Sequence, residues 1–216
     1  MKIKIIGLGV LLFAFFQVSA QTAPLGKDVV KSFSEKMKGY QSIKASFTFT
    51  LENLKENISD THEGKLVIKG SKYYLDLMGM EIYFNGTTKW QYIPEAREVT
   101  ISNPSSVEGG FFEDPSKIFT DYEKDFKSKF IGEKIESGKY VYEVDLYPND
   151  ISVSYSIIKI KFLKDNLEPQ SIKYQGKDGN NYIIKVKKFK ANAPAKDEDF
   201  AFEPKKIKGI EIVDLR

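Results

Sequence analysis

Hydrophobic positions follow a helical period near the start of the chain and a strand period directly after it. Val29, Val30, Phe33 and Met37 recur at short intervals with lysines between them, which predicts an amphipathic helix that ends near Gly39. From residue 43 to residue 51, apolar residues occupy every second position and polar residues lie between them. This alternation predicts a strand with one buried face.

Short alternating runs continue along the chain and predict about ten strands in all. After the strand at 43–51, the runs cover 65–69, 73–78, 82–84, 87–92, 98–101, 140–147, 153–163, 170–174, 182–189 and 200–202. Asn85-Gly86 predicts a tight hairpin, and Pro94-Glu95 and residues 175–181 predict further turns. Because no segment between the runs has strand–helix–strand spacing, we expect an antiparallel sheet.

Residues 103–129 interrupt the strand pattern. They contain several prolines and glycines, and residues 116–126 have a helical pattern. We expect this segment and the first helix to cover one face of the sheet. Since open sheets of roughly ten strands tend to curl, the expected fold is mainly β (α+β), a single curved antiparallel sheet forming an incomplete β-barrel. Its apolar interior could be a packed core or a ligand cavity, and the pattern alone favours the core.

The first twenty residues have the organisation of a secretory signal peptide. Lys2 and Lys4 precede an apolar run from Ile5 to Phe16, and Val18-Ser19-Ala20 has the small residues of a cleavage site. Cleavage after Ala20 leaves one domain, residues 21–216, and removal of two lysines lowers the formal charge from +3 to +1. We therefore expect an exported, periplasmic protein that binds no nucleic acid, because nucleic-acid binders need a net basic surface.

The composition is poor in groups that perform catalysis. The chain has no cysteine and one histidine, His62, which excludes thiol nucleophiles and metal sites built from several histidines. His62 lies in a polar stretch that we interpret as a solvated loop. Phosphate-binding and dinucleotide-binding glycine motifs are missing too. We expect no enzyme, no catalytic residue, no metal and no cofactor.

Lysines alternate with apolar residues on two of the later strands. They are Lys159, Lys161, Lys185, Lys187 and Lys188. The simpler interpretation is a solvated outer face of the sheet. A second interpretation, left open here, is a weak electrostatic dock for a partner or for anionic lipid headgroups.

Four motifs lie in an order that is found in a known family. The first helix leads into Ile-Lys-Ala-Ser-Phe-Thr at 43–48, and Glu-Gly-Lys-Leu-Val-Ile-Lys follows at 63–69. Residues 85–94 contain Asn-Gly and Trp-Gln-Tyr-Ile-Pro, and residues 199–204 read Asp-Phe-Ala-Phe-Glu-Pro. These stretches resemble the LolA-like family of periplasmic outer-membrane lipoprotein carrier proteins, over essentially the whole mature chain. The segment around Trp90 is the most specific of them.

The resemblance implies a half-barrel that holds acyl chains. Members of that family take acylated lipoproteins from an inner-membrane ATP-driven complex and carry them across the periplasm. The expected partners are therefore the lipoproteins, that complex and, where one exists, an outer-membrane acceptor. We expect a monomer that binds no nucleotide. The resemblance also shifts the expectation for the interior from a packed core to a cavity.

The expected cavity residues are apolar residues at alternating strand positions. They are Phe47, Phe49, Leu66, Ile68, Leu75, Leu77, Ile82, Trp90, Tyr92, Val144, Ile158, Ile160 and Ile184. The expected lid residues are Phe33 and Met37 of the first helix and Ile118 and Phe119 of the middle segment. For Leu75 and Leu77 the choice of face is open, because Tyr74 alternates with them and a slip of one residue would turn the set outward.

The chain departs from the family where the second strand ends. The family has an Arg-Pro pair there, and its arginine ties the closed lid to the sheet; here the matching residue is Gly70, followed by Ser71 and Lys72. Lys72 could replace the arginine only as a single-point donor, so we expect a lid that is held differently. The alternative function is a lipid- or lipoprotein-sensing adaptor with the same half-barrel.

Overall fold

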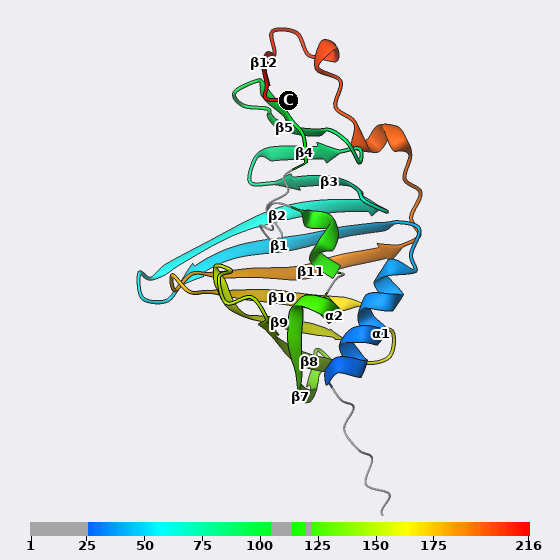
Figure 1. Cartoon of the computed structure of the whole chain (residues 1–216), viewed down its shortest axis with the longest axis vertical. Coiled ribbons are helices and arrows are strands. Elements are labelled where there is room, and N and C mark those ends of the chain that lie inside the picture. The colour runs from blue at the N-terminus through cyan, green and yellow to red at the C-terminus, as the bar shows by residue number, and fades with distance from the viewer. Residues whose placement is uncertain (1–25, 105–113, 120–121) are drawn as a thin grey trace, which may run out of the picture.

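The computed structural model describes residues 26–104, 114–119 and 122–216. The predicted signal peptide and its cleavage site lie outside these residues. Within the described part, one long helix, α1 (Gly26–Lys38), precedes a twelve-stranded sheet (Figure 1). No helix of this part is long and apolar enough to cross a membrane.

The sheet is open and curved, and it does not close into a barrel. Its strands lie in the order β12-β6-β5-β4-β3-β2-β1-β11-β10-β9-β8-β7. Their bounds are β1 (Ile43–Asn53), β2 (Ile58–Lys69), β3 (Lys72–Leu77), β4 (Met80–Phe84), β5 (Lys89–Ile93), β6 (Glu98–Ser102), β7 (Phe126–Glu136), β8 (Lys139–Pro148), β9 (Tyr155–Leu163), β10 (Pro169–Gly176), β11 (Asn181–Ala191) and β12 (Glu211–Asp214). The expected curved, mainly β architecture is therefore confirmed.

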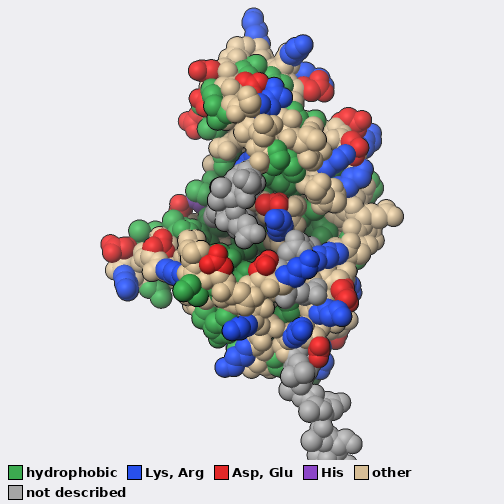
Figure 2. Space-filling view, viewed as in Figure 1, with side chains coloured by type: hydrophobic (Ala, Val, Ile, Leu, Met, Phe, Trp, Pro, Cys, Tyr) green, Lys and Arg blue, Asp and Glu red, His purple; other side chains and the backbone are tan. Residues whose placement is uncertain are grey.

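The helical residues 115–119 and 122–125 of the middle segment lie on the same face of the sheet as α1 (Figure 1). Within the segment, the structure has the 3-10 helix η2 (Pro115–Phe119) and the four-residue helix α2 (Tyr122–Asp125). We call the covered face of the sheet the inner face, the opposite one the outer face, and α1, η2 and α2 together the cover. The side of α1 that faces solvent gathers lysine side chains (Figure 2).

Several predicted elements are wrong in detail. The helix expected over 116–126 ends at Asp125, and Phe126 begins the edge strand β7, which the sequence pattern missed because most of its residues are exposed. The expected strand at 200–202 is the end of the 3-10 helix η3 (Asp197–Phe200) and an irregular stretch. His62, expected in a loop, lies in β2 opposite Phe49. The Asn85-Gly86 turn is a four-residue connection from β4 to β5.

The short strand β12 was not expected, and it departs from the antiparallel pattern. It pairs parallel to β6, with Ile212 opposite Val99. The chain reaches it through η3 and a second 3-10 helix, η4 (Pro204–Lys206). Because an unpaired edge strand invites pairing with other chains, this four-residue strand protects the edge at β6.

Candidate functional site

The inner face is apolar across most of the sheet. Residues that are directly opposite one another on neighbouring strands share a face, so the register identifies it: Phe49 is opposite Ile184, Ile184 opposite Ile172, and Ile172 opposite Ile160. Towards the other edge, Leu66 is opposite Leu75 and Leu75 opposite Ile82. Ala45, on the same face of β1 and opposite Leu66, joins these two apolar regions beneath the cover. His62, opposite Phe49, adds one polar side chain to this face of β2.

Eleven of the thirteen predicted cavity residues lie together on this face. They are Phe47, Phe49, Leu66, Ile68, Leu75, Leu77, Ile82, Val144, Ile158, Ile160 and Ile184, all buried and all in one apolar cluster. Leu75 and Leu77 point inward, and Tyr74 points outward opposite Val67 and Tyr83. The face of Leu75 and Leu77, which the sequence pattern left open, is therefore the inner one.

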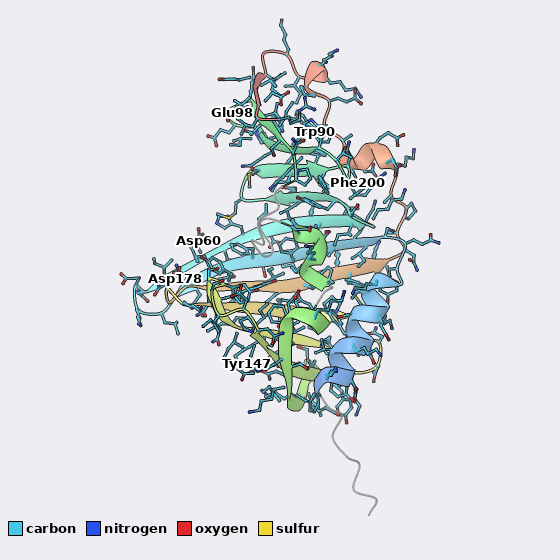
Figure 3. The ribbon with its side chains drawn as sticks, viewed as in Figure 1. Asp60, Trp90, Glu98, Tyr147, Asp178 and Phe200 are labelled. Carbon is cyan, nitrogen blue, oxygen red and sulfur yellow. The ribbon has the colours of Figure 1, made fainter. Side chains whose placement is uncertain are left out.

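Trp90 and Tyr92 lie on the other face, so their expected grouping with the eleven is wrong. Trp90 is opposite Tyr83, and the residue opposite Ile82 is Gln91. Trp90 and Tyr92 belong to a separate apolar cluster with Val99, Ile101 and residues of the C-terminal segment, and Figure 3 shows Trp90 at the end of the sheet remote from α1. The spacing Trp-x-Tyr places both side chains on the same face of β5. It does not say which of the two faces of the sheet this is.

The four predicted lid residues are buried against the inner face. Phe33, Met37, Ile118 and Phe119 are each at most 2% exposed and belong to the same cluster as the inner-face residues. Phe33 stacks on Phe162 at 4.9 Å between ring centroids, and Phe119 meets Phe189 edge-on at 5.9 Å. The cover therefore fills the concave side of the sheet with aromatic side chains.

A glycine accommodates the aromatic ring of Phe47 on the inner face. Gly64 is the β2 residue opposite Phe47, and a Cβ added to Gly64 would lie 2.4 Å from Phe47 Cζ. The ring of Phe47 thus lies across the β2 backbone, where any other residue would collide with it. Sequence reasoning missed this role of Gly64, and it also missed the fully buried Phe162.

A pocket of about 380 Å³ opens where the cover meets the sheet. Its inner part consists of Met37, Ile43, Ile68 and Phe119, which are buried, and its rim carries polar and exposed groups. The rim residues are Lys38, Tyr40, Ser42, Gly70, Ser71, Asp114, Ser116 and Lys117. An apolar floor beneath a polar rim suits a molecule with one polar end and one apolar end.

One buried polar group of the cover is unsatisfied. Ser34, on α1, is 0% exposed, and its hydroxyl has no hydrogen-bond partner among the described residues. An unmade hydrogen bond of this kind costs about 1–3 kcal/mol. The closed arrangement of α1 therefore contains a local destabilising element.

Lys72 does not hold the cover. Its Nζ lies 2.9 Å from Oδ2 of Asp197, and Nζ of Lys69 lies 2.9 Å from Oδ1 of the same carboxylate. Asp197 belongs to η3, on the outer face, and the two lysines lower its pKa to about 2. Lys69 and Lys72, on either side of Gly70, therefore form ion pairs with the C-terminal segment and not with the cover.

The described residues hold no group of three or more histidine, cysteine or acidic side chains that could bind a metal. His62 has one acidic neighbour, with Nε2 2.9 Å from Oδ2 of Asp60. Both residues lie on β2 towards its hairpin with β1, on the side of the sheet where Figure 3 labels Asp60.

Comparisons with known proteins agree with this architecture. The family model described as outer membrane lipoprotein carrier protein LolA matches residues 38–203, and a search of curated proteins finds no match. An uncharacterized conserved protein from Thermus thermophilus has 10% identity and a TM-score of 0.54, over 87% of this chain and 98% of that chain.

Two further solved structures are similar at lower TM-scores. A LolA superfamily protein from Nitrosomonas europaea has 12% identity and a TM-score of 0.44, over 83% of this chain and 99% of that one. A chain of the Pseudomonas aeruginosa MucA/MucB complex has 15% identity and a TM-score of 0.40, over 82% of this chain and 61% of that one. Since the family model spans most of the sequence, the chain belongs to the outer membrane lipoprotein carrier protein family, LolA.

Proposed function

We propose that this protein is a periplasmic carrier that binds the acyl chains of lipoproteins against its inner face and shuttles them from the inner to the outer membrane. The observation that carries the proposal is the broad apolar cluster on the inner face, covered by one helix and two short helical segments instead of further strands. Family membership supports the choice of an acylated ligand.

The energetics of an acyl chain suit such a face. Burying apolar carbon stabilises by about 0.8 kcal/mol per CH₂, so a long acyl chain gains roughly 12 kcal/mol on leaving water. To admit a chain, the cover must move, and moving it exposes Phe33 and Phe119, which pack on the sheet through ring contacts. The acyl chain would then replace the cover on the same apolar surface, and the hydroxyl of Ser34 would gain water.

The pocket at the edge of the cover is the proposed entrance. Its apolar floor receives the end of the chain, and its polar rim keeps the acylated end in water. The partners that follow from the proposal are acylated lipoproteins, an inner-membrane ATP-driven complex that releases them and, where one exists, an outer-membrane acceptor.

Blocking the entrance tests the proposal. Ser71 is exposed at the rim of the pocket, so Ser71→Trp would add bulk there without disturbing the core. We expect a fluorescent fatty acid to bind the mature protein and to bind Ser71→Trp at least about tenfold more weakly, which corresponds to about 1.4 kcal/mol.

The matched control is Ala96→Trp, in the exposed turn between β5 and β6. It adds the same side chain away from the pocket and should leave the affinity unchanged. Mass spectrometry of organic extracts from protein purified out of its native compartment should also detect acylated lipoprotein or lipid. Absence of any co-purifying lipid together with no probe binding would refute the carrier function.

A further inference from the structure

The outer face of β1 and β11 carries a group of lysines in adjacent positions. Lys44 is directly opposite Lys190, Ser46 is opposite Lys188, and Thr48 is opposite Lys185. Lys44 is half-buried and the other three lysines are exposed. We call Lys44, Lys185, Lys188 and Lys190 the lysine patch. It lies on the side of the sheet that the cover does not touch.

A β-bulge increases the density of lysines at this place. The register shifts between Ser46 and Phe47, so Lys187 has no residue opposite it on β1. The extra residue of a bulge changes the direction of neighbouring side chains. Lys187 accordingly reaches the outer face, where its Nζ pairs with Glu63 of β2.

The carboxylates of this surface are already engaged with other lysines. Glu63 pairs with Lys187, Asp76 pairs with Lys65 at 3.1 Å, and Glu52 pairs with Lys173 at 3.0 Å. Among the described residues the patch lysines form no ion pair. Lys185 contributes to the lowered pKa of Glu52 only through its charge, without a direct contact.

Positive charge therefore accumulates on the middle of the outer face. The outer positions of β1, β2, β3, β10 and β11 hold nine lysines against three carboxylates, and Asp197 of η3 supplies a fourth. The excess is five positive charges on a mature chain whose expected net charge is +1. Like charges directly opposite on neighbouring strands destabilise a sheet. An anionic surface that neutralises these lysines therefore removes their repulsion and stabilises the folded protein.

We propose that the lysine patch docks this protein on the surface of an anionic phospholipid bilayer. The inference goes beyond the proposed carrier function, since it concerns the opposite face of the sheet. Docking through the patch leaves the cover and the pocket free to open.

The chemistry of the patch favours a bilayer over an acidic protein. Protein interfaces concentrate their binding energy in tryptophan, tyrosine and arginine, and none of these occurs at the outward positions of β1 or β11. The residues between the lysines are Ser46 and Thr48. Lysine ammonium groups are compact charges that attract phosphate without fixed geometry. Binding to dispersed lipid headgroups requires this charge attraction and no precise arrangement of hydrogen bonds.

Co-sedimentation of the mature protein with vesicles tests the docking. We expect binding to vesicles that contain phosphatidylglycerol, no binding to pure phosphatidylcholine vesicles, and release as the salt concentration rises. Each lysine near an anionic surface strengthens binding about fivefold, so Lys44→Gln, Lys188→Gln and Lys190→Gln together should weaken it roughly a hundredfold.

The control is the triple variant Lys27→Gln, Lys205→Gln and Lys208→Gln, which makes the same change in net charge at exposed sites elsewhere. It should retain most of the binding. Equal losses in both variants would mean that net charge alone is responsible, and no binding to phosphatidylglycerol vesicles would leave an acidic protein as the better partner; either result overturns the proposal. Fatty-acid binding without vesicles should be unchanged in the patch variant, so this test and that of the carrier function fail independently.

Discussion

At the scale of single residues, the inner face depends on a close fit between Gly64 and Phe47. Alternation of apolar residues identified Phe47, whereas nothing in the sequence near Gly64 indicates that its missing side chain leaves room for a ring from the next strand. Glycine in a strand often marks such a close approach. The pair is a good test of the register.

We predict that Gly64→Ala destabilises the protein by about 1–3 kcal/mol, the usual cost of overpacking a core. Unfolding in urea measures this. In a Phe47→Leu background the same substitution should cost less, because the ring that collides is gone and the two sites are coupled. An equal cost in both backgrounds would contradict the observed packing.

Ser34 is a second residue whose role only the folded structure reveals. Its hydroxyl is buried in α1 and has no partner within the described part of the chain. We predict that Ser34→Ala raises the free energy of unfolding by about 1 kcal/mol, because it removes an unsatisfied polar group. It should also weaken fatty-acid binding, since stabilising the closed cover lowers the population of open protein.

Ser32→Ala is the matched control for this prediction. Ser32 lies on the same helix and is exposed, so its replacement should raise the free energy of unfolding only by the roughly 0.5 kcal/mol of alanine's higher helix propensity, less than Ser34→Ala, and should leave the affinity unchanged. A loss of stability in Ser34→Ala would show that the hydroxyl has a partner in solution.

At the scale of elements, the C-terminal segment is held on the outer face by ion pairs and aromatic contacts. Its 3-10 helix η3 is tied to the end of β2 and the start of β3 by Asp197, Lys69 and Lys72, and Phe202 packs on Tyr83 and Tyr92. β12 then completes the edge beside β6. The segment therefore packs on the outer face from the end of β2 to β6, opposite the face that the cover protects.

The ion pairs of Asp197 predict a pH dependence. The two lysines hold its pKa at about 2, below its ordinary value of 3.8, so its stabilising effect is complete above about pH 4 and disappears as the pH falls towards about 2. Wild-type protein should unfold at a higher temperature than Asp197→Asn near neutral pH, and the two midpoints should converge near the lower end of this range.

The control for this experiment is Asp165→Asn, in an exposed turn between β9 and β10, which should match the wild type at every pH. A gap between wild type and Asp197→Asn that does not change with pH would show that the carboxylate acts through packing and not through its charge.

Two elements show why patterns fail at the edges of a sheet. β7 has no continuous apolar face along its length, and β12 is four residues long. Edge strands are held by hydrogen bonds to one neighbour and keep much of their surface in water. The side-chain pattern that reveals a half-buried strand is therefore weak in them.

At the scale of the whole molecule, the two faces of one sheet divide the chemistry. The inner face holds most of the buried apolar side chains under the cover. The outer face carries the unneutralised lysines of β1 and β11 and a smaller apolar cluster around Tyr92 and Val99. A nearly neutral mature composition conceals this separation. The open sheet makes it possible, because it presents both faces over its full width.

The sequence alone was enough to predict the class of fold, α1, most of the strands, and the shared face of eleven of the thirteen predicted cavity residues, because periods of 3.6 and 2 report directly which side chains are buried. The tertiary structure decided the rest: which face Trp90 and Tyr92 occupy, what Lys69 and Lys72 hold, and where the lysines meet. These depend on register and on contacts between segments far apart in the chain. A period-two pattern describes two faces equally well and cannot say which of them the cover will bury.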